Sequence, residues 1–384
     1  MKTRAKGIKE GKAVCGSMQN GNGPIGIVDV SPNGNHAFSA IVSLMLGIKP
    51  IETKVKKFSD GEVDIDIDGS VRGTDVFLFQ SYVAPVGERK YEFENTVSAA
   101  RSGGGARRIT AVWPYCFGMR GERQTRPRQS VPIEVWARSA YAMGVEQIVT
   151  VGLHTDVIKT IFRAVGERGG IKVEDLPFEP LAANYIMQSA IARDLTDIVV
   201  ASPDSGGTKR AEKVLELIAQ NSSLRPDLAI GHKYRSPDEQ TTPLRLVGDV
   251  AGKSVFIYDD IAGTLGTIEG ATRMVEDAGA KDITLLFIHP VLGKGYEESL
   301  ERLAANPKIR EIVFGNSIPL KSAALNCPKV REIPLEPFVA EAIRRLNANE
   351  SMSDLHKYGT IVEIYERMRE EGVSPRRFDI RQIG

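Results

Sequence analysis

Residues Val255 to Thr267 read VFIYDDIAGTLGT, a pattern that indicates the fold class. Apolar, β-prone residues lead into two carboxylates, Asp259 and Asp260, and the chain then enters a turn rich in Gly and Thr. From Ile268 to Ala278 the apolar residues have the spacing of a helix. The sequence therefore predicts a strand, a turn and a helix in direct succession.

This succession suits the binding of a phosphate group. The first N–H groups of a helix have no partner within the helix, and the helix dipole favours an anion at that end. Asp259 and Asp260 would lie beside whatever the phosphate is attached to, and two adjacent acids suit the vicinal hydroxyls of a ribose. The alternative is an ordinary turn with solvated aspartates, since Gly/Thr turns are common. The turn consists of Gly263, Thr264, Leu265, Gly266 and Thr267.

Length and charge limit the possible classes of protein. A chain of 384 residues exceeds the usual size of one domain, so we expect two domains with separate cores. The 50 Lys+Arg nearly balance the 49 Asp+Glu, which argues against nucleic acid as a partner. We expect no membrane partner and no signal peptide, because no apolar run could span a bilayer and residues 1–12 are charged.

The cysteines indicate the compartment. Cys15, Cys116 and Cys327 stand far apart, their number is odd, and their spacing is not that of metal ligands. We therefore expect no structural disulfide and a reducing cytoplasm.

The remaining pattern alternates strand and helix signals, which favours α/β domains with a mainly parallel sheet and helices on both faces. The segment 63–68 alternates acidic and apolar residues, as expected for a half-exposed hairpin arm. We expect a join between the domains around 165–185, and apolar residues at helical spacing near the C-terminal end. The predicted organisation is a flexible extension (1–22), a first domain (23–170), a second domain (171–350) and a helical appendix (351–384).

Several stretches follow one another in the order and approximate spacing of one enzyme family. They resemble the ribose-phosphate diphosphokinases, also called phosphoribosyl-diphosphate synthetases, over roughly residues 25 to 350. A single motif of this kind is weak evidence for the family, whereas the whole series in this order is specific to it. The motifs are Phe58 to Glu62, Ser70 to Gly73, Arg107 to Val112, Leu153-His154, Ser202 to Gly207, His232 to Arg235, the Asp259-Asp260 turn, His289 to Leu292 and Asn316 to Pro319.

The resemblance implies two tandem phosphoribosyltransferase-like domains and a defined reaction. The diphosphoryl group of Mg-ATP would pass to the anomeric hydroxyl of a phosphorylated ribose, with release of AMP and with Mg²⁺ as cofactor. Such a transfer depends mostly on positioning and on neutralising charge. The resemblance also implies a homo-oligomer, a dimer or hexamer, whose ATP sites are completed across an interface.

Family counterparts of Lys233 and Arg235 form a basic catalytic pair on a loop that closes over the phosphates. Arg235 can grip two oxygens, while Lys233 offers a compact charge for the transition state. The alternative is a solvated loop with surface cations. His154 and Asp204 match the metal-associated residues of the family, although a lone His is more often structural and Mg²⁺ prefers oxygen.

The nucleotide would be bound by two separate segments. Asp60, Gly61 and Glu62 match residues that contact ATP from the neighbouring subunit, and Phe58 would stack on the adenine; a core position for Phe58 is the alternative. Arg120 matches a nucleotide-contacting Arg, with Gly121 beside it. The other arginines of that loop, Arg123, Arg126 and Arg128, stay unassigned.

Three positions depart from the family pattern. Gly152 stands where the family has Asp, Gly121 stands where it has Gln, and Gly263 opens a turn that normally begins with Asp. The changes are compatible with a weakly active regulatory homologue, with neutral drift around ribose 5-phosphate, or with a larger acceptor, because Gly lets a backbone approach a ligand closely.

ADP-ribose is such an acceptor, since its 5-phosphate bears AMP and its anomeric hydroxyl is free. Some phage-encoded relatives of this family are understood to make ADP-ribose pyrophosphate in a route that rebuilds NAD, and this chain resembles them; its compartment would then be the host cytoplasm. A phosphoribosyltransferase, which shares the acid-containing turn, is the alternative from another class.

Overall fold

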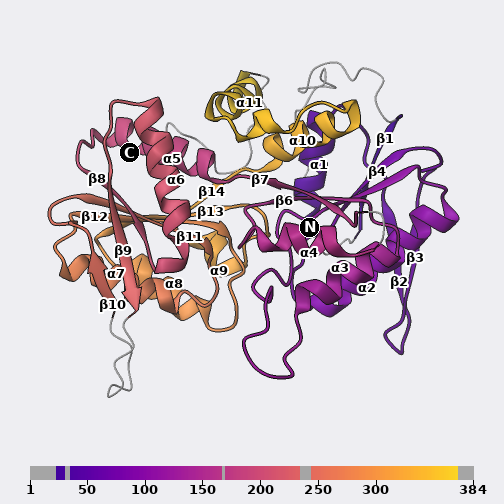
Figure 1. The fold of residues 1–384 in the computed structure, drawn as a ribbon, viewed down its shortest axis with the longest axis horizontal. Coiled ribbons are helices and arrows are strands. Elements are labelled where there is room, and N and C mark those ends of the chain that lie inside the picture. Colours follow the sequence, from indigo (N-terminus) through magenta and orange to yellow (C-terminus); the bar gives the residue numbers. More distant parts are fainter. Residues whose placement is uncertain (1–22, 31–34, 167–168, 234–243, 371–384) are drawn as a thin grey trace.

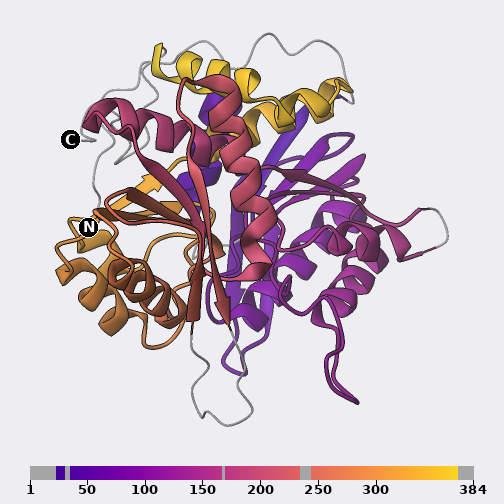
Figure 2. The same cartoon turned by 60° about the vertical axis from the view of Figure 1, so that its left-hand side comes forward.

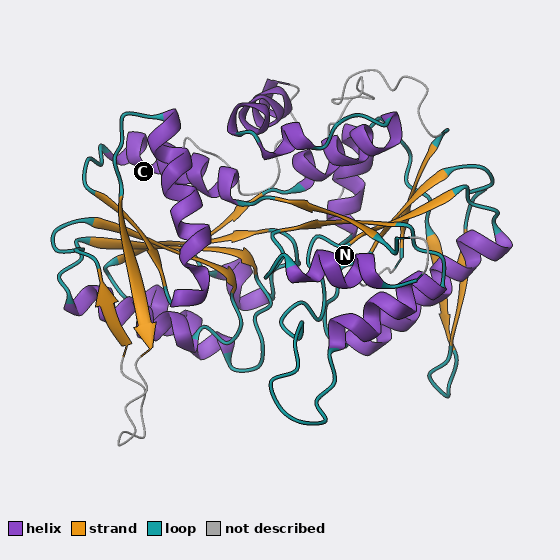
Figure 3. Ribbon diagram, viewed as in Figure 1, coloured by secondary structure: helices purple, strands orange, loops and turns teal. Residues whose placement is uncertain are grey.

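The computed structural model describes residues 23–30, 35–166, 169–233 and 244–370. Within them the chain forms two large sheets that lie side by side, each flanked by helices (Figures 1 and 3). No helix in these ranges is long and apolar enough to cross a membrane. The predicted extension 1–22 and the end of the predicted appendix, 371–384, lie outside the described residues.

The first sheet has five strands, all paired in parallel. In spatial order the strands are β1 (Ile25–Asp29), β4 (Asp75–Phe79), β5 (Arg108–Val112), β6 (Gln147–Val151) and β7 (Lys172–Leu176). Strand β4 is buried along its whole length, and β5 and β6 are buried after their first residue, because helices cover both faces.

A separate antiparallel hairpin, β2 (Thr53–Lys57) and β3 (Val63–Ile67), projects from this domain (Figure 1). Val63 and Ile65 are buried while Asp64 and Asp66 are exposed, as the alternating sequence predicted. The hairpin therefore turns one apolar face to the domain and one acidic face to solvent.

The second sheet has seven strands, and β10 at its edge is the one that runs antiparallel to its neighbour. The strands in spatial order are β10 (Leu244–Val247), β9 (Asp227–Lys233), β8 (Ile198–Ser202), β11 (Ser254–Ile261), β12 (Asp282–His289), β13 (Ile309–Gly315) and β14 (Val330–Ile333).

The helices divide the interior into three cores. On one side of both sheets, α1, α5, α6, α10 and α11 share a single apolar core, and Figure 2 shows α10 and α11 above α1. On the other side, α2 to α4 cover the first sheet and α7 to α9 cover the second. The helices are α1 (His36–Met45), α2 (Val86–Ser98) with a π-helical turn (Ala99–Gly103), α3 (Pro132–Ala142), α4 (Val157–Ala164), α5 (Glu179–Arg193), α6 (Thr208–Asn221), α7 (Gly266–Asp277), α8 (Tyr296–Ala305), α9 (Ser322–Asn326), α10 (Glu336–Ala348) and α11 (Tyr358–Glu370), with 3₁₀ turns at Ser205–Gly207 and Ser353–His356.

The expected boundary between 170 and 171 falls one strand too early. Strand β7 begins at Lys172 and pairs with β6, so it completes the first sheet. The segment expected as a join also contains the first half of α5, a helix whose side chains are buried on several sides between the domains. A helix buried all round has no one-sided apolar pattern, which explains why the sequence did not reveal it.

A buried polar contact ties α10 of the second half to the first sheet. Asp75, fully buried at the start of β4, accepts hydrogen bonds from Arg108 Nε at 2.7 Å and from Asn347 Nδ2 at 3.1 Å. Arg108 Nη2 also donates to the carbonyl of Leu346 at 3.2 Å. The two halves are thus joined by hydrogen bonds between the Asp75–Arg108 ion pair and α10, as well as by apolar packing.

We predict that Asp75→Ala lowers the free energy of unfolding by about 3–5 kcal/mol, because it leaves the Arg108 charge without its buried partner. Chemical denaturation measures this loss. Asp227→Ala is the matched control, since Asp227 pairs with Lys253 at 2.8 Å but has a 61% exposed side chain. An equal effect of the two substitutions would contradict a special role for Asp75.

Candidate active site

The segment around Asp259 and Asp260 folds as a strand, a turn and a helix, as the sequence predicted. Strand β11 ends at Ile261 directly after the two acids, and α7 begins at Gly266. Leu265 has φ 65° and ψ −4°, a left-handed conformation that costs a non-glycine residue roughly 1 kcal/mol. Backbone strain of this kind concentrates at ligand-binding sites. The hydroxyl-bearing residues Thr264 and Thr267 are exposed at the N-terminal end of α7.

A cleft of ≈ 550 Å³ lies where the carboxyl ends of strands from the two sheets meet. Parallel α/β sheets bind ligands at this edge. Both domains contribute to its walls, the first through the loops after β5 and β6, the second through the loops after β8, β11 and β12. The predicted site residues in its lining are Arg120, His154, Asp204, Asp259, Asp260, Gly263, Thr264, Leu265 and Thr267.

The two acids at the end of β11 lie in different environments. Asp260 is 4% exposed and its Oδ2 lies 2.5 Å from His154 Nδ1, while Oδ1 lies 3.3 Å from Arg210 Nη2. Burial favours a raised pKa for Asp260, but the His154 hydrogen bond and the Arg210 charge outweigh it and lower that pKa to about 2. Burial and the neighbouring Asp260 charge raise the pKa of Asp259 to about 7.

His154 joins the domains through its ring. The hydrogen bond to Asp260, opposed by burial, raises the pKa of His154. With Nδ1 engaged by Asp260, only Nε2 is left for another partner. Asp204, on the loop after β8, lines the same cleft, and its Oδ1 accepts from the Gly206 amide at 2.9 Å. Among the described residues, no three His, Cys, Asp or Glu side chains are grouped as metal ligands.

A buried histidine of the second domain supports the loop that carries His154. His289 Nε2 lies 3.1 Å from the carbonyl oxygen of Gly152, and its Nδ1 lies 2.8 Å from Ser317 Oγ. A carbonyl only accepts, so Nε2 carries the proton and Nδ1 accepts from Ser317. Burial lowers the pKa of His289 to about 4, which keeps the ring neutral.

Four predicted nucleotide residues lie away from this cleft. Phe58, Asp60, Gly61 and Glu62 occupy the turn between β2 and β3, and none of them lines the cleft. Phe58 is 42% exposed with Lys56 Nζ 4.7 Å from its ring centre, so the alternative of a core position is wrong. Within one chain, the hairpin turn and the strand-edge cleft are separate surfaces.

Two of the glycines that depart from the family pattern do not widen the cleft. A Cβ on Gly121 would lie 2.7 Å from Pro132 Cδ, and Gly121 is absent from the lining. Gly152 has φ +58°, and its Cβ would lie 2.6 Å from Ile288 Cδ1. Packing therefore explains both. Gly263 differs, because its Cβ would face Arg120 Nη1 at 3.9 Å inside the cleft.

The predicted catalytic pair is only partly described. Lys233 is the last residue of β9, and Arg235 lies outside the described residues. Strand β9 runs parallel to β8, which in turn runs parallel to β11. The backbone of Lys233 therefore lies at the same sheet edge as the acids of β11.

Sequence reasoning missed Arg210, which contacts both acids and the His154 backbone. Its only signal was its place near the start of a helix that follows a strand of the sheet.

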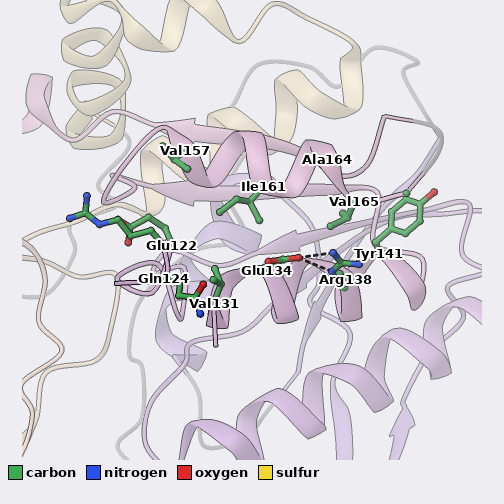
Figure 4. Close-up of a pocket in the computed structure, with 12 residues that line it drawn as sticks. Glu122, Gln124, Val131, Glu134, Arg138, Tyr141, Val157, Ile161, Ala164 and Val165 are labelled. Atoms are coloured by element: carbon green, nitrogen blue, oxygen red, sulfur yellow. Dashed lines mark hydrogen bonds and ion pairs between the residues drawn. The ribbon is translucent and has the colours of Figure 1, made fainter. Parts of the chain in front are cut away.

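A second hollow of ≈ 600 Å³ lies between α3, α4 and the loop after Arg120 (Figure 4). Its lining is mostly apolar around the Glu134–Arg138 ion pair, and it includes none of the predicted site residues whose side chains are described.

Comparison with solved structures places this architecture in a class. The chain superposes on phosphoribosylpyrophosphate synthetase from Mycobacterium smegmatis with a TM-score of 0.75 and 29% sequence identity, over 85% of this chain and 100% of that one. Two family models also match: the N-terminal domain of ribose phosphate pyrophosphokinase at residues 27–144, and the phosphoribosyl synthetase-associated domain at residues 219–357. The fold is thus an α/β pair of tandem phosphoribosyltransferase-like domains.

Curated relatives give the family. The chain is 32% identical to ribose-phosphate pyrophosphokinase from Campylobacter jejuni over 85% of its length and 97% of that protein. It is 33% identical to the protein of that name from Bacillus caldolyticus over 84% of its length and 95% of the relative. The chain belongs to the ribose-phosphate pyrophosphokinase family and is a transferase of that type.

We predict that Asp259→Asn stabilises the protein at about pH 8 by on the order of 2 kcal/mol, with no gain near pH 4. Its pKa of about 7 means that between about pH 4 and pH 7 the folded state keeps a proton that the unfolded chain has released, so that at pH 8 the wild type bears the full cost of the buried charge. Wild-type stability at this site is therefore lost as pH rises from about 4 to about 7.

Chemical denaturation across this pH range measures the effect. The control is Asp249→Asn, because a hydrogen bond from Lys253 lowers the pKa of Asp249 and its neutralisation brings no gain at pH 8. A stability difference for Asp259→Asn that is independent of pH would contradict the prediction.

Proposed function

We propose that this enzyme transfers the diphosphoryl group of Mg-ATP to the anomeric hydroxyl of a 5-phosphorylated ribose and releases AMP. The observation that carries the proposal is the adjacency, in one cleft, of a buried acid pair and a hydroxyl-bearing turn at a helix N-terminus. Asp259 and Asp260 suit the ribose hydroxyls. The N–H groups and hydroxyls of Gly263–Thr267 suit the 5-phosphate.

The transfer itself needs charge more than covalent chemistry from the protein. Arg120 reaches the cleft from the first domain and supplies one cation for the triphosphate. We assign the moving diphosphoryl group to Lys233 and Arg235, because β9 ends at the same sheet edge as the acids. An ionised Asp260, held by His154, keeps the sugar hydroxyls oriented during transfer.

The cleft also suits a hard cation whose ligands come mostly from the phosphates of the bound nucleotide. Mg²⁺ keeps water and phosphate oxygens as ligands and needs few protein groups. Asp204 offers a carboxylate at the wall of the cleft, and His154 offers only Nε2. Mg²⁺ would neutralise charge on the phosphates. Since the raised pKa of His154 opposes its use as a metal ligand, Asp204 is the better candidate of the two.

The adenine and its ribose would be bound by the β2–β3 turn of a second copy of the chain. Phe58 presents a half-exposed ring, and Asp60 and Glu62 are exposed beside it. An aromatic face suits an adenine ring, and two acids suit ribose hydroxyls. Activity would therefore require a homo-oligomer.

A second acceptor, ADP-ribose, is favoured by Gly263. A Cβ at this position would lie 3.9 Å from Arg120 Nη1. Because glycine has no Cβ, the side of the turn that faces Arg120, where the 5-phosphate would lie, is left without a side chain. A phosphate that bears AMP needs an open side to its cradle, and Arg120 is placed to neutralise the second phosphate. ADP-ribose pyrophosphate would then be the product.

We predict that wild-type protein releases AMP from ATP with ADP-ribose as acceptor, and that Gly263→Asp lowers kcat/KM for ADP-ribose at least tenfold more than for ribose 5-phosphate. The new carboxylate would repel the second phosphate and fill the open side. Gly359→Asp is the control, since a side chain at this helical position meets nothing within 4 Å.

The same assay separates the alternatives. A clear preference of the wild type for ribose 5-phosphate would end the ADP-ribose proposal. A phosphoribosyltransferase would release diphosphate only when a nucleobase is added, and a regulatory homologue would bind nucleotide without producing AMP.

We predict that Lys233→Ala lowers kcat by on the order of a hundredfold or more while ATP binding changes little, because a contact made to developing charge affects rate more than ground-state binding. Steady-state AMP release and nucleotide calorimetry measure the two effects. Lys253→Ala, on the opposite edge of the sheet, should keep wild-type turnover. Unchanged kcat in Lys233→Ala would remove Lys233 from the catalytic role.

A further inference from the structure

Arg210 lies on the first turn of α6 with its guanidinium directed at three groups of the cleft wall. Nη1 donates to the carbonyl oxygen of His154 at 3.2 Å. Nη2 lies 3.3 Å from Asp260 Oδ1 and 3.9 Å from Asp259 Oδ1. The side chain is 17% exposed, so these contacts are largely shielded from water.

Arg210 and its partners come from three separate elements. The acids end β11, His154 follows β6 of the other sheet, and Arg210 itself belongs to the helix after β8. A guanidinium has five N–H donors in one plane and can hold several acceptors at fixed angles, which an ammonium group cannot do. Among the described residues that line the cleft, Arg210 is thus the one whose side chain contacts both acids and the His154 loop.

Burying the guanidinium at this position is energetically unfavourable. Arg210 Nε is buried without a hydrogen-bond partner among the described residues, and burial of an unmatched donor is unfavourable. The guanidinium also interacts electrostatically with the half-buried Glu179 and the buried Tyr258. A chain that only needed to fill this space would place an apolar residue there.

We propose that Arg210 is a positioning residue that sets the orientation of the acid pair relative to the His154 loop and so prepares the site for the sugar. The proposal rests on the proposed function and extends it to a residue three positions beyond the Ser202–Gly207 motif. Without Arg210, two adjacent carboxylates repel each other and the His154 loop loses a link to the second domain.

The test is Arg210→Ala, with binding of ribose 5-phosphate and ADP-ribose measured by calorimetry beside AMP release. We expect sugar affinity to fall on the order of tenfold or more and kcat to fall with it, while ATP binding changes little. Arg210→Lys should recover only part of the sugar affinity, because one ammonium group cannot reach both acids and the His154 carbonyl.

Millimolar guanidinium should restore sugar affinity in Arg210→Ala and leave the wild type unchanged, a result that misfolding would not give. Lys213→Ala on the same helix is the control. Sugar affinity equal to wild type in Arg210→Ala, or a loss that guanidinium leaves unrestored, would overturn the proposal. Sugar binding that depends on Arg210 in a protein that releases no AMP would support this role and count against the proposed function alone.

Discussion

The hydrogen bond between His154 and Asp260 is the contact on which the site depends. It joins residues 106 positions apart in sequence and bridges the two sheets at their carboxyl edges. A carboxylate that is 4% exposed is stable only if its charge is matched, and here His154 and Arg210 supply the match. The acid pair of β11 can therefore exist in its buried form only while the first domain holds its β6 loop against the second.

That requirement explains other features of the interior. His289 contacts the Gly152 carbonyl of the first domain through Nε2 and Ser317 of its own domain through Nδ1, and burial keeps the ring neutral so that it adds no second positive charge next to His154. Asp75 with Asn347, together with the core shared by α1, α5, α10 and α11, fixes the domains at another point. Apolar burial supplies most of the attraction, while the polar contacts define how the two sheets are aligned.

Local patterns could be predicted from the sequence, and contacts between distant segments could not. The strand, turn and helix around Asp259 follow from a few neighbouring residues, as does the hairpin with its alternating acids. Helix α5 was missed because it is buried on several sides, and Arg210 because only the fold brings α6 to the end of β11. The glycines show the same limit of sequence-based prediction. The sequence treats Gly121 and Gly263 alike, whereas the structure shows that Gly121 packs against Pro132 and that Gly263 faces the cleft.

The topology of the first sheet also bears on the proposed nucleotide site. The hairpin is inserted between β1 and β4, and Ile51, just before it, bridges to Val28 of β1 at the outer edge of the sheet. His154 follows β6, which is separated from β1 by β4 and β5. At about 4.8 Å per strand, the four spacings from Ile51 to β6 put the start of the hairpin roughly 19 Å from β6, and the hairpin extends away from it. Phe58 therefore cannot reach the cleft of its own chain without crossing the sheet. A role for this turn in binding ATP requires a second copy of the chain, so the proposals of a nucleotide-binding turn and of a homo-oligomer stand or fall together.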